Sequence, residues 1–266
     1  MYALAALEAA LKDTIFAGKL HFSQVTGSTN SDAIEAARTG APHGMVFFAD
    51  EQTAERGRGD HGWESLAGQG LYVSVLLRLA LPATQASLLP LAVGLAAVEA
   101  IRVASGLQAD LRWPNDLLIG PRKTGGILVE SKTNQSMLDY AVAGIGINVH
   151  QREFAADLAT PATSLDLESG RRISRQELLI ALLKSLELEM RAYYVPHGFE
   201  TIPRAVEEAS TWIRGKRVHV HGPQACTGIR AGLDEHGFLR VQTETGLVTV
   251  RTGGLRAAEN EPADIS

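Results

Sequence analysis

The glycine-rich segment at residues 51–63 contains two arginines, whose side chains commonly bind anions. Arg56, Gly57 and Arg58 are adjacent, and three glycines fall within six residues of this segment. Glycine lets the backbone approach a ligand closely, and arginine offers a fixed fork of donors that matches a carboxylate or a phosphate. The segment therefore predicts a loop that holds an anionic ligand. A solvated surface loop is the alternative, because Arg-Gly-Arg is a common combination.

A second candidate site is the Trp-Pro-Asn-Asp motif at residues 113–116, which Arg112 precedes and an apolar strand follows. The proline favours an extended tryptophan before it and removes a backbone donor. Asn115 and Asp116 then stand at the entrance of a strand, where polar side chains usually bond a specific partner. A structural turn is the alternative, since Asn and Asp favour turns.

Lys123 is the third candidate, and it comes just before a pair of glycines. A turn at residues 120–122 joins strands expected at 116–119 and 126–131, so Lys123 should lie near the tip of a hairpin, close to the Asn-Asp pair. A lysine in this setting can meet a phosphate as a point charge. The segment is not a P-loop, because no Gly-Lys-Ser/Thr precedes a helix. A solvated hairpin lysine is the alternative.

The fourth candidate is a strand in which Gly144 and Gly146 alternate with isoleucines and Asn148 follows. Alternating glycines let a ligand or another backbone lie flat against a strand. The Asn148 amide could then bond a base edge or a phosphate. A Rossmann fingerprint is excluded, because no helix follows this strand.

The elements that must position these residues follow from the apolar pattern. Short connections between the strands at residues 111–149 favour antiparallel pairing. After residue 216 only short alternating strands with glycine turns remain, which indicates a small β-barrel. The chain is therefore expected to be α+β up to about residue 210. Strands are expected at 20–26, 45–49, 71–79, 111–119, 126–132 and 137–149, and helices at 1–12, 29–38, 84–105 and 174–193.

Composition narrows the class of protein. The chain has 266 residues, 25 Lys and Arg against 30 Asp and Glu, and one cysteine. These values are typical of a soluble globular protein and exclude a generally basic nucleic-acid coat and an intramolecular disulfide framework. The N-terminus lacks the cationic start of a signal peptide, and the apolar run at 88–101 is too short to span a bilayer. We therefore expect a cytoplasmic protein that binds neither nucleic acid nor a membrane.

Taken together and in chain order, these motifs resemble those of the biotin protein ligases, also called biotin–[acetyl-CoA-carboxylase] ligases. The combination of Trp-Pro-Asn-Asp with a nearby Lys-x-Gly-Gly-Ile-Leu element is specific, and the resemblance covers about residues 20–255. The matching pieces are Gly27-Ser28-Thr29-Asn30, Gln52 with Arg56-Gly57-Arg58-Gly59, Arg112-Trp113-Pro114-Asn115-Asp116, Lys123 with Gly125-Gly126-Ile127-Leu128-Val129-Glu130, Gly144-Ile145-Gly146-Ile147-Asn148, and Ala162-Thr163-Ser164-Leu165.

The resemblance implies an α+β (α/β) fold. A mixed-sheet biotin/lipoate ligase-like catalytic domain would occupy residues 1–210, an SH3-like β-barrel residues 211–258 and a tail residues 259–266. It also implies an ATP-dependent ligase that activates biotin as biotinyl-5′-AMP. The biotinyl group would then pass to a lysine of the biotin carboxyl carrier protein of acetyl-CoA carboxylase. The family uses Mg²⁺ and often forms homodimers.

The resemblance also implies the site residues. The catalytic residues would be Lys123, Arg58 and Asp116, with Asp116 also the candidate magnesium ligand. Biotin would be bound by Ser28, Thr29, Asn30, Gln52, Arg56, Gly57, Arg58, Lys123, Gly125, Gly126, Gly144 and Gly146. ATP would be bound by Arg56, Arg58, Trp63, Asn115, Lys123 and Asn148.

Three alternatives compete with this interpretation. A lipoate–protein ligase shares the implied fold and the adenylation step but lacks the arginine loop and the Trp-Pro-Asn-Asp motif. A biotin-sensing repressor would need a helix-turn-helix domain, and the roughly 20 residues before the first expected strand are too few for one. An inactive family member is the third alternative, because Glu55 and Asp60 stand where the family loop usually has glycines.

Overall fold

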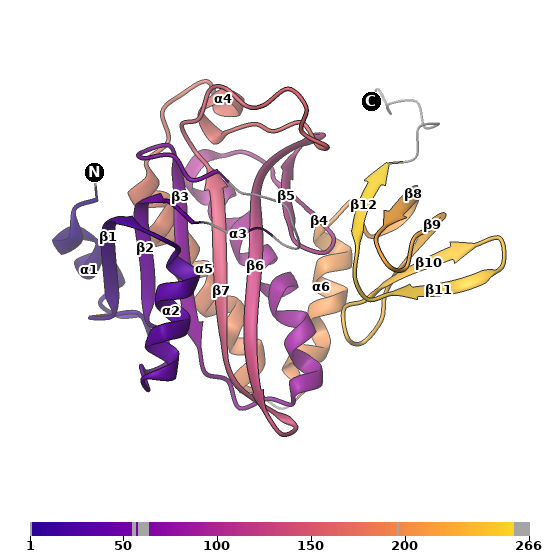
Figure 1. The fold of residues 1–266 in the computed structure, drawn as a ribbon, viewed down its shortest axis with the longest axis horizontal. Helices are drawn as coiled ribbons and strands as arrows, with labels where there is room; N and C mark the ends of the chain where they lie inside the picture. The colour runs from indigo at the N-terminus through magenta and orange to yellow at the C-terminus, as the bar shows by residue number, and fades with distance from the viewer. Residues whose placement is uncertain (1, 55–56, 58–63, 196, 258–266) are drawn as a thin grey trace.

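The computed structural model describes residues 2–54, 57, 64–195 and 197–257. A seven-stranded mixed sheet forms the centre of the larger part, in the order β1-β2-β3-β7-β6-β5-β4 (Figure 1). Its strands are β1 (Leu20–Thr26), β2 (Val46–Gln52), β3 (Gly70–Leu77), β4 (Asp110–Arg112), β5 (Asp116–Ile119), β6 (Arg122–Asn134) and β7 (Met137–Asn148). This mixed sheet confirms the expected fold class.

Strand direction follows from the connections. β1 and β2 are parallel, and the helix α2 (Thr29–Arg38) connects them, because parallel neighbours need a crossover. Every other neighbouring pair in the sheet is antiparallel, as the short connections predict. α2 begins at Thr29, where this helix was expected to start, and only Gly27 and Ser28 separate it from the end of β1.

Helices cover both faces of the sheet. α3 (Leu89–Ser105) and α5 (Arg175–Met190) lie behind it in Figure 1, and α2 lies in front. Gly106 ends α3 in the left-handed conformation, and Ser174 caps α5 by accepting a hydrogen bond from the backbone of Glu177, both as predicted. The remaining helical segments are α1 (Leu4–Leu11), η1 (Ala83–Leu88), α4 (Leu165–Ser169), η2 (Arg191–Tyr194), η3 (Gly198–Thr201) and α6 (Ile202–Ala209).

The apolar character of α3 reflects its place in the core. Together with η1 it forms a helical stretch, Ala83–Ser105, that is long and apolar enough to cross a membrane by length and composition alone. Within the described residues it is the one helix of that kind, and 61% of its apolar window is buried. The stretch is longer than the apolar run at 88–101 in the sequence, because η1 extends it before residue 88 and α3 continues to Ser105.

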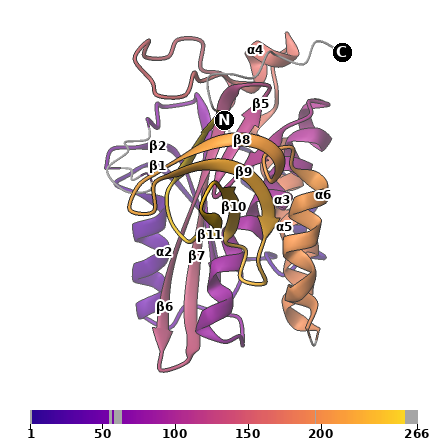
Figure 2. The same cartoon turned by 90° about the vertical axis from the view of Figure 1, so that its right-hand side faces the viewer.

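The last part of the chain forms a separate five-stranded antiparallel sheet, in the order β11-β10-β9-β8-β12. It corresponds to the small β-barrel expected from the alternating pattern, and Figure 2 shows it beside α3 and α6. Its first strand begins two residues earlier than expected, and its last strand was not predicted. The strands are β8 (Arg214–His221), β9 (Cys226–Leu233), β10 (Leu239–Thr243), β11 (Gly246–Val250) and β12 (Gly254–Ala257).

One sequence-based strand is wrong. Residues 111–119 were expected to form one strand, but a turn at 113–115 divides them into β4 and β5, and this is the turn given as the alternative for the Trp-Pro-Asn-Asp motif. The backbone amide of Asn115 donates to the carbonyl of Arg112 at 3.1 Å and closes this turn. The apolar residues on both sides are buried, so hydrophobicity alone made the segment look like one strand.

The two sheets are joined by a tight contact at Gly237. The indole Nε1 of Trp113 donates to the Gly237 carbonyl at 3.0 Å, and the Ser87 hydroxyl donates to the carbonyl of His236 at 2.8 Å. A Cβ on Gly237 would lie 2.6 Å from a methyl group of Leu91. Gly237 also has φ of +75°, so both its conformation and its surroundings favour glycine.

We expect Gly237→Ala to destabilise the protein more than Gly106→Ala does. Both glycines have nearly the same positive φ, +75° and +78°, so alanine should cost about 1–2 kcal/mol of backbone strain at either site. A Cβ on Gly106 would meet nothing within 4 Å, whereas one on Gly237 would collide with the side chains of Leu88 and Leu91 at the start of α3. Denaturant unfolding measures both free energies, and equal losses would show that the contact at Gly237 contributes nothing.

Candidate active site

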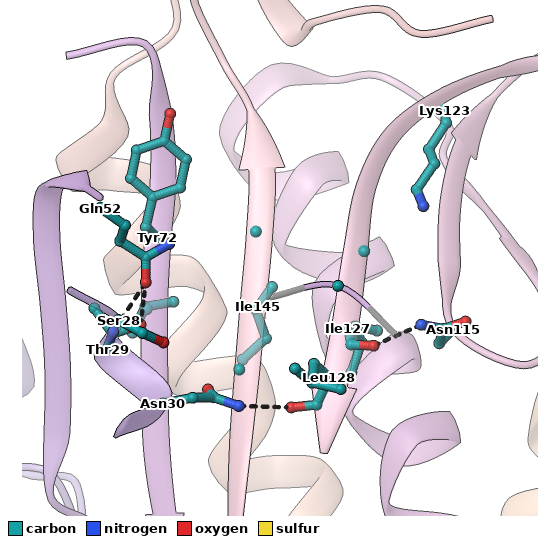
Figure 3. A pocket seen from close by; sticks show the side chains of 15 residues that line it. Ser28, Thr29, Asn30, Gln52, Tyr72, Asn115, Lys123, Ile127, Leu128 and Ile145 are labelled. Carbon is teal, nitrogen blue, oxygen red and sulfur yellow. Dashed lines mark hydrogen bonds between the residues drawn. The ribbon is translucent and has the colours of Figure 1, made fainter. Parts of the chain in front are cut away.

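A pocket opens over the centre of the large sheet, where the start of α2 faces strands β3, β6 and β7 (Figure 3). The space above the lining residues, counted out to the open mouth and into the solvent there, is about 570 Å³. Its lining residues are Ser28, Thr29, Asn30, Gln52, Gly57, Tyr72, Val73, Asn115, Lys123, Gly126, Ile127, Leu128, Gly144, Ile145 and Gly146. Segments more than 100 residues apart in the chain therefore share one cavity.

One end of the pocket is polar. The backbone amide and the hydroxyl of Thr29 both donate to the side-chain oxygen of Gln52, at 2.9 and 3.0 Å. The side-chain nitrogen of Gln52 donates to the Ser65 hydroxyl at 2.8 Å. Ser28 occupies the N-cap position of α2, but in the described chain its hydroxyl caps no helix amide and instead lines the pocket. These groups form a rigid set of donors and acceptors at the helix start.

A buried network supports this polar end from below. Ser74, which is fully buried, lies 2.7 Å from the Thr29 hydroxyl and donates to the Asn30 side-chain oxygen at 2.6 Å. The Asn30 amide donates in turn to the carboxylate of Glu130 at 2.8 Å. Because each member holds the next, the side chains of Thr29 and Asn30 have little freedom. The sequence motifs did not identify Ser74, since a single serine in an apolar strand carries no signal.

The middle of the pocket is apolar. Tyr72 and Val73 of β3 and Ile145 of β7 belong to its lining, together with Ile127 and Leu128 of β6. Figure 3 shows Ile145 and Leu128 between the Gln52 end and Lys123. The sequence gives no sign that Tyr72 and Val73 line a pocket, because the residues of β3 are apolar almost throughout and nothing in their pattern marks the face that a ligand would touch.

Glycine keeps the sheet open under the pocket. A Cβ on Gly144 would overlap the side-chain oxygen of Asn30, and a Cβ on Gly125 would lie 2.8 Å from the carbonyl of Gly146. Gly126, Gly144 and Gly146 line the cavity, whereas Gly125 is not among the described lining residues. The close approach predicted for the strand with Gly144 and Gly146 is therefore made in part by another protein segment, the start of α2, which packs its Asn30 side chain against Gly144.

The opposite end of the pocket is cationic. The Lys123 ammonium lies 2.6 Å from one carboxylate oxygen of Asp116, and the other oxygen accepts from the Arg112 guanidinium at 2.7 Å. Burial alone would raise the pKa of Asp116, but the charges of Lys123 and Arg112 and their hydrogen bonds outweigh it and hold that pKa below its usual value. Two cations thus share one carboxylate beside the cavity.

The backbone fixes Lys123 in this position. Its amide donates to the Pro161 carbonyl at 2.8 Å, and its carbonyl accepts from the Thr163 amide at 2.9 Å, which forms a parallel bridge centred on Ala162. Asn115 lies nearby and donates its amide to the Ile127 carbonyl at 2.7 Å. The prediction that the Lys123 hairpin approaches the Asn-Asp pair is confirmed by these contacts.

Other predicted site residues lie elsewhere. Asn148 is buried and donates its amide to the Thr163 carbonyl at 3.1 Å, so it braces the segment beside Lys123 and is not among the described lining residues. Arg56, Arg58 and Trp63 lie outside the residues that the structure describes, as do Glu55 and Asp60. Gly57 is described and belongs to the pocket lining.

Asp116 does not fit a magnesium site in this arrangement. Both of its carboxylate oxygens are engaged by cations. Magnesium sites in nucleotide-dependent enzymes commonly combine one or two carboxylates with substrate phosphates, and a metal ion at Asp116 would have to approach oxygens that already contact Lys123 and Arg112.

Comparison with known proteins identifies relatives along most of the chain. Residues 22–148 match the biotin/lipoate A/B protein ligase family. The bifunctional ligase/repressor BirA of Bacillus subtilis is 35% identical over 240 residues, which are 89% of this chain and 73% of that protein. The biotin–[acetyl-CoA-carboxylase] ligase of Mycobacterium tuberculosis is 32% identical over 235 residues, 86% of this chain and 85% of that protein.

Solved structures agree with these relatives. The biotin protein ligase from Aquifex aeolicus in complex with biotin and ATP superposes with a TM-score of 0.75 and 29% identity, covering 91% of this chain and all of that one. The match therefore includes the second sheet as well as the large one. On the sequence, the family match and the fold together, the chain belongs to the biotin protein ligases of the biotin/lipoate A/B protein ligase family.

Proposed function

We propose that this chain joins biotin to ATP as biotinyl-5′-AMP and transfers the biotinyl group to a lysine of a biotin carboxyl carrier protein. One observation carries the proposal: the pocket has a rigid polar end at Thr29 and Gln52, an apolar middle and a cationic end at Lys123. Biotin has the same sequence of properties, with a ureido ring, an apolar tail and a carboxylate. The ring would bond Thr29 and Gln52, and the carboxylate would point to Lys123.

The first step joins two anions. An oxygen of the biotin carboxylate attacks the α-phosphorus of ATP, the bond to the β,γ-phosphates breaks, and pyrophosphate leaves. Little proton transfer is needed, so positioning and charge neutralisation are the main tasks. Lys123 would contact the carboxylate and the α-phosphate, and Arg56 and Arg58 would approach the same anions from the glycine-rich loop.

The second step transfers the biotinyl group. The neutral amine of a carrier lysine attacks the carbonyl carbon of the mixed anhydride, an amide bond forms, AMP leaves and the amine loses a proton. The pKa of Asp116 is held low by its two cations, which makes it a weak proton acceptor. We therefore assign Asp116 to orienting Lys123, in preference to the role of general base.

The nucleotide would lie on the Lys123 side of the pocket. Asn115 lines this side, and Trp63 would stack on the adenine from the loop. Asn148 would act indirectly, because its amide holds the Thr163 carbonyl beside the Lys123 backbone. The large domain at residues 1–210 would bind both substrates, and residues 211–258 would form the second domain.

Lipoate ligation is the nearest rival activity, and exchange of labelled pyrophosphate into ATP separates the two. Biotin alone should support exchange, and purified carrier domain should then become labelled only when biotin and ATP are both present. Exchange that lipoate supports and biotin does not would show the substrate to be wrong. Sequence-specific operator binding in a gel-shift assay would contradict the expectation that the chain has no repressor activity.

We expect Lys123→Ala to reduce biotinyl-AMP formation by about 100- to 1,000-fold, the usual effect of removing one donor that stabilises developing charge. Lys132→Ala is the matched control, because Lys132 lies on the same strand and its side chain is 60% exposed, away from the pocket. Circular dichroism should show both variants folded. An active Lys123→Ala variant would exclude Lys123 from the chemistry.

Thr29→Val should weaken biotin binding about 5- to 100-fold, because the near-isosteric change leaves Gln52 and Ser74 without their hydroxyl partner. Thr39→Val is the control: Thr39 is exposed at the other end of α2, and its hydroxyl donates to the backbone carbonyls of Glu35 and Ala36 in that helix. Isothermal titration with biotin measures both affinities. If the two variants bind equally well, Thr29 does not recognise the ligand.

A further inference from the structure

Trp212 lies at the junction of the two sheets, and its ring has an arginine within cation–π distance on each of two elements. The guanidinium carbon of Arg112, at the end of β4, is 5.5 Å from the ring centroid. That of Arg230, on β9, is 5.3 Å away. Arg112 is 7% exposed and Arg230 is 3% exposed, so both contacts are largely shielded from water. Desolvation strengthens cation–π contacts.

The chain leading to Trp212 is fastened to β4. The Ser210 hydroxyl donates to the Leu111 carbonyl at 2.6 Å and accepts from the Trp212 amide at 3.0 Å. The Thr211 hydroxyl donates to the carboxylate of Asp110 at 2.6 Å. Three successive residues of the linker therefore bond to β4 or to each other, directly beside Arg112.

Arg112 in turn holds the cluster at the cationic end of the pocket. Its Nη2 donates both to Asp116, at 2.7 Å, and to the Thr160 hydroxyl, at 3.0 Å, and the second Asp116 oxygen contacts Lys123. The Arg112 Nε also donates to Asp116, at 3.2 Å, so its hydrogen bonds reach two acceptor atoms along one edge of the guanidinium and still allow rotation about that edge. A flat indole beside the guanidinium restricts that rotation.

We propose that Trp212 is a positioning residue for adenylate formation: it sets the plane of Arg112, which orients Asp116 and so directs the Lys123 ammonium into the pocket. Arg230 holds the indole from the second sheet. This inference rests on the proposed function and extends it, because it gives the second domain a part in the chemistry without contact to the substrates. The sequence offered no sign of it, since the residues are far apart in the chain.

The test compares Trp212→Leu, Trp212→Phe, Arg112→Lys and the double variant Trp212→Leu/Arg112→Lys in biotin-dependent pyrophosphate exchange. Trp212→Leu should lower the exchange rate about tenfold, the effect expected of a desolvated cation–π contact. Trp212→Phe keeps an aromatic face and should restore most of the rate. Adding Trp212→Leu to Arg112→Lys should change the rate by less than about twofold, because both changes break the same chain of contacts.

Phe238→Leu is the control for general damage to the second domain. Phe238 has its own arginine, with the Arg251 guanidinium carbon 5.8 Å from its ring centroid, and it is not part of the chain of contacts to Lys123. This variant should exchange at the wild-type rate, and unfolding midpoints should show all variants folded. Wild-type exchange in Trp212→Leu, or a full additive loss in the double variant, would overturn the proposal.

A measurement without turnover separates this inference from the proposed function. The ¹⁵Nε–Hε resonance of Arg112, assigned by its loss in Arg112→Lys, should be sharp in the wild type and in Trp212→Phe and broadened in Trp212→Leu. An unchanged resonance in Trp212→Leu would contradict the positioning role. Wild-type protein without biotin-dependent exchange would instead overturn the proposed function, and the resonance would still report whether Trp212 holds Arg112.

Discussion

Asp116 stands between Lys123 and Arg112, and this shared carboxylate determines the electrostatics of the pocket. Charged side chains lose much of their hydration when they are half-buried, so a lone lysine there would turn towards water. The carboxylate keeps Lys123 beside the cavity and also holds Arg112. A pocket that is to bring two anions together needs a cation held in a fixed direction, and the backbone bridge between Lys123 and Ala162 fixes the position of Lys123.

The mixed sheet makes this arrangement possible. β7 lies between β3 and β6, so the polar end formed by α2 and β2 and the cationic end formed by β5 and β6 face one surface of the sheet. Gly126, Gly144 and Gly146 on β6 and β7 line that surface, and glycine at position 144 also lets the Asn30 side chain pack directly on the sheet, where a Cβ would overlap it. The apolar residues between the two ends keep the groups that would bind a ligand's polar head apart from the cation that would bind its charged tail.

Sequence reasoning succeeded where the signal is local. The helices expected at 29–38 and 174–193 correspond to α2 and α5 within three residues at each end, and the helix expected at 84–105 corresponds to η1 followed by α3. Two of these ends depend on a single local residue, because Ser174 caps the start of α5 and Gly106 ends α3. It failed at residues 111–119, where two short buried strands and the turn between them have the same apolar pattern as one long strand. It also missed Tyr72 and Ser74, whose roles depend on which strand lies beside which.

The types of the site residues, their order along the chain and the family they indicate were determined by the sequence itself, because motifs such as Trp-Pro-Asn-Asp followed by Lys123 retain a fixed spacing. Only the tertiary structure decided what each residue touches. Asp116 meets two cations, Asn148 turns to the Thr163 carbonyl, and Trp212 is flanked by arginines from two different sheets. These outcomes depend on strand register and on the packing of distant segments, which local sequence patterns do not specify.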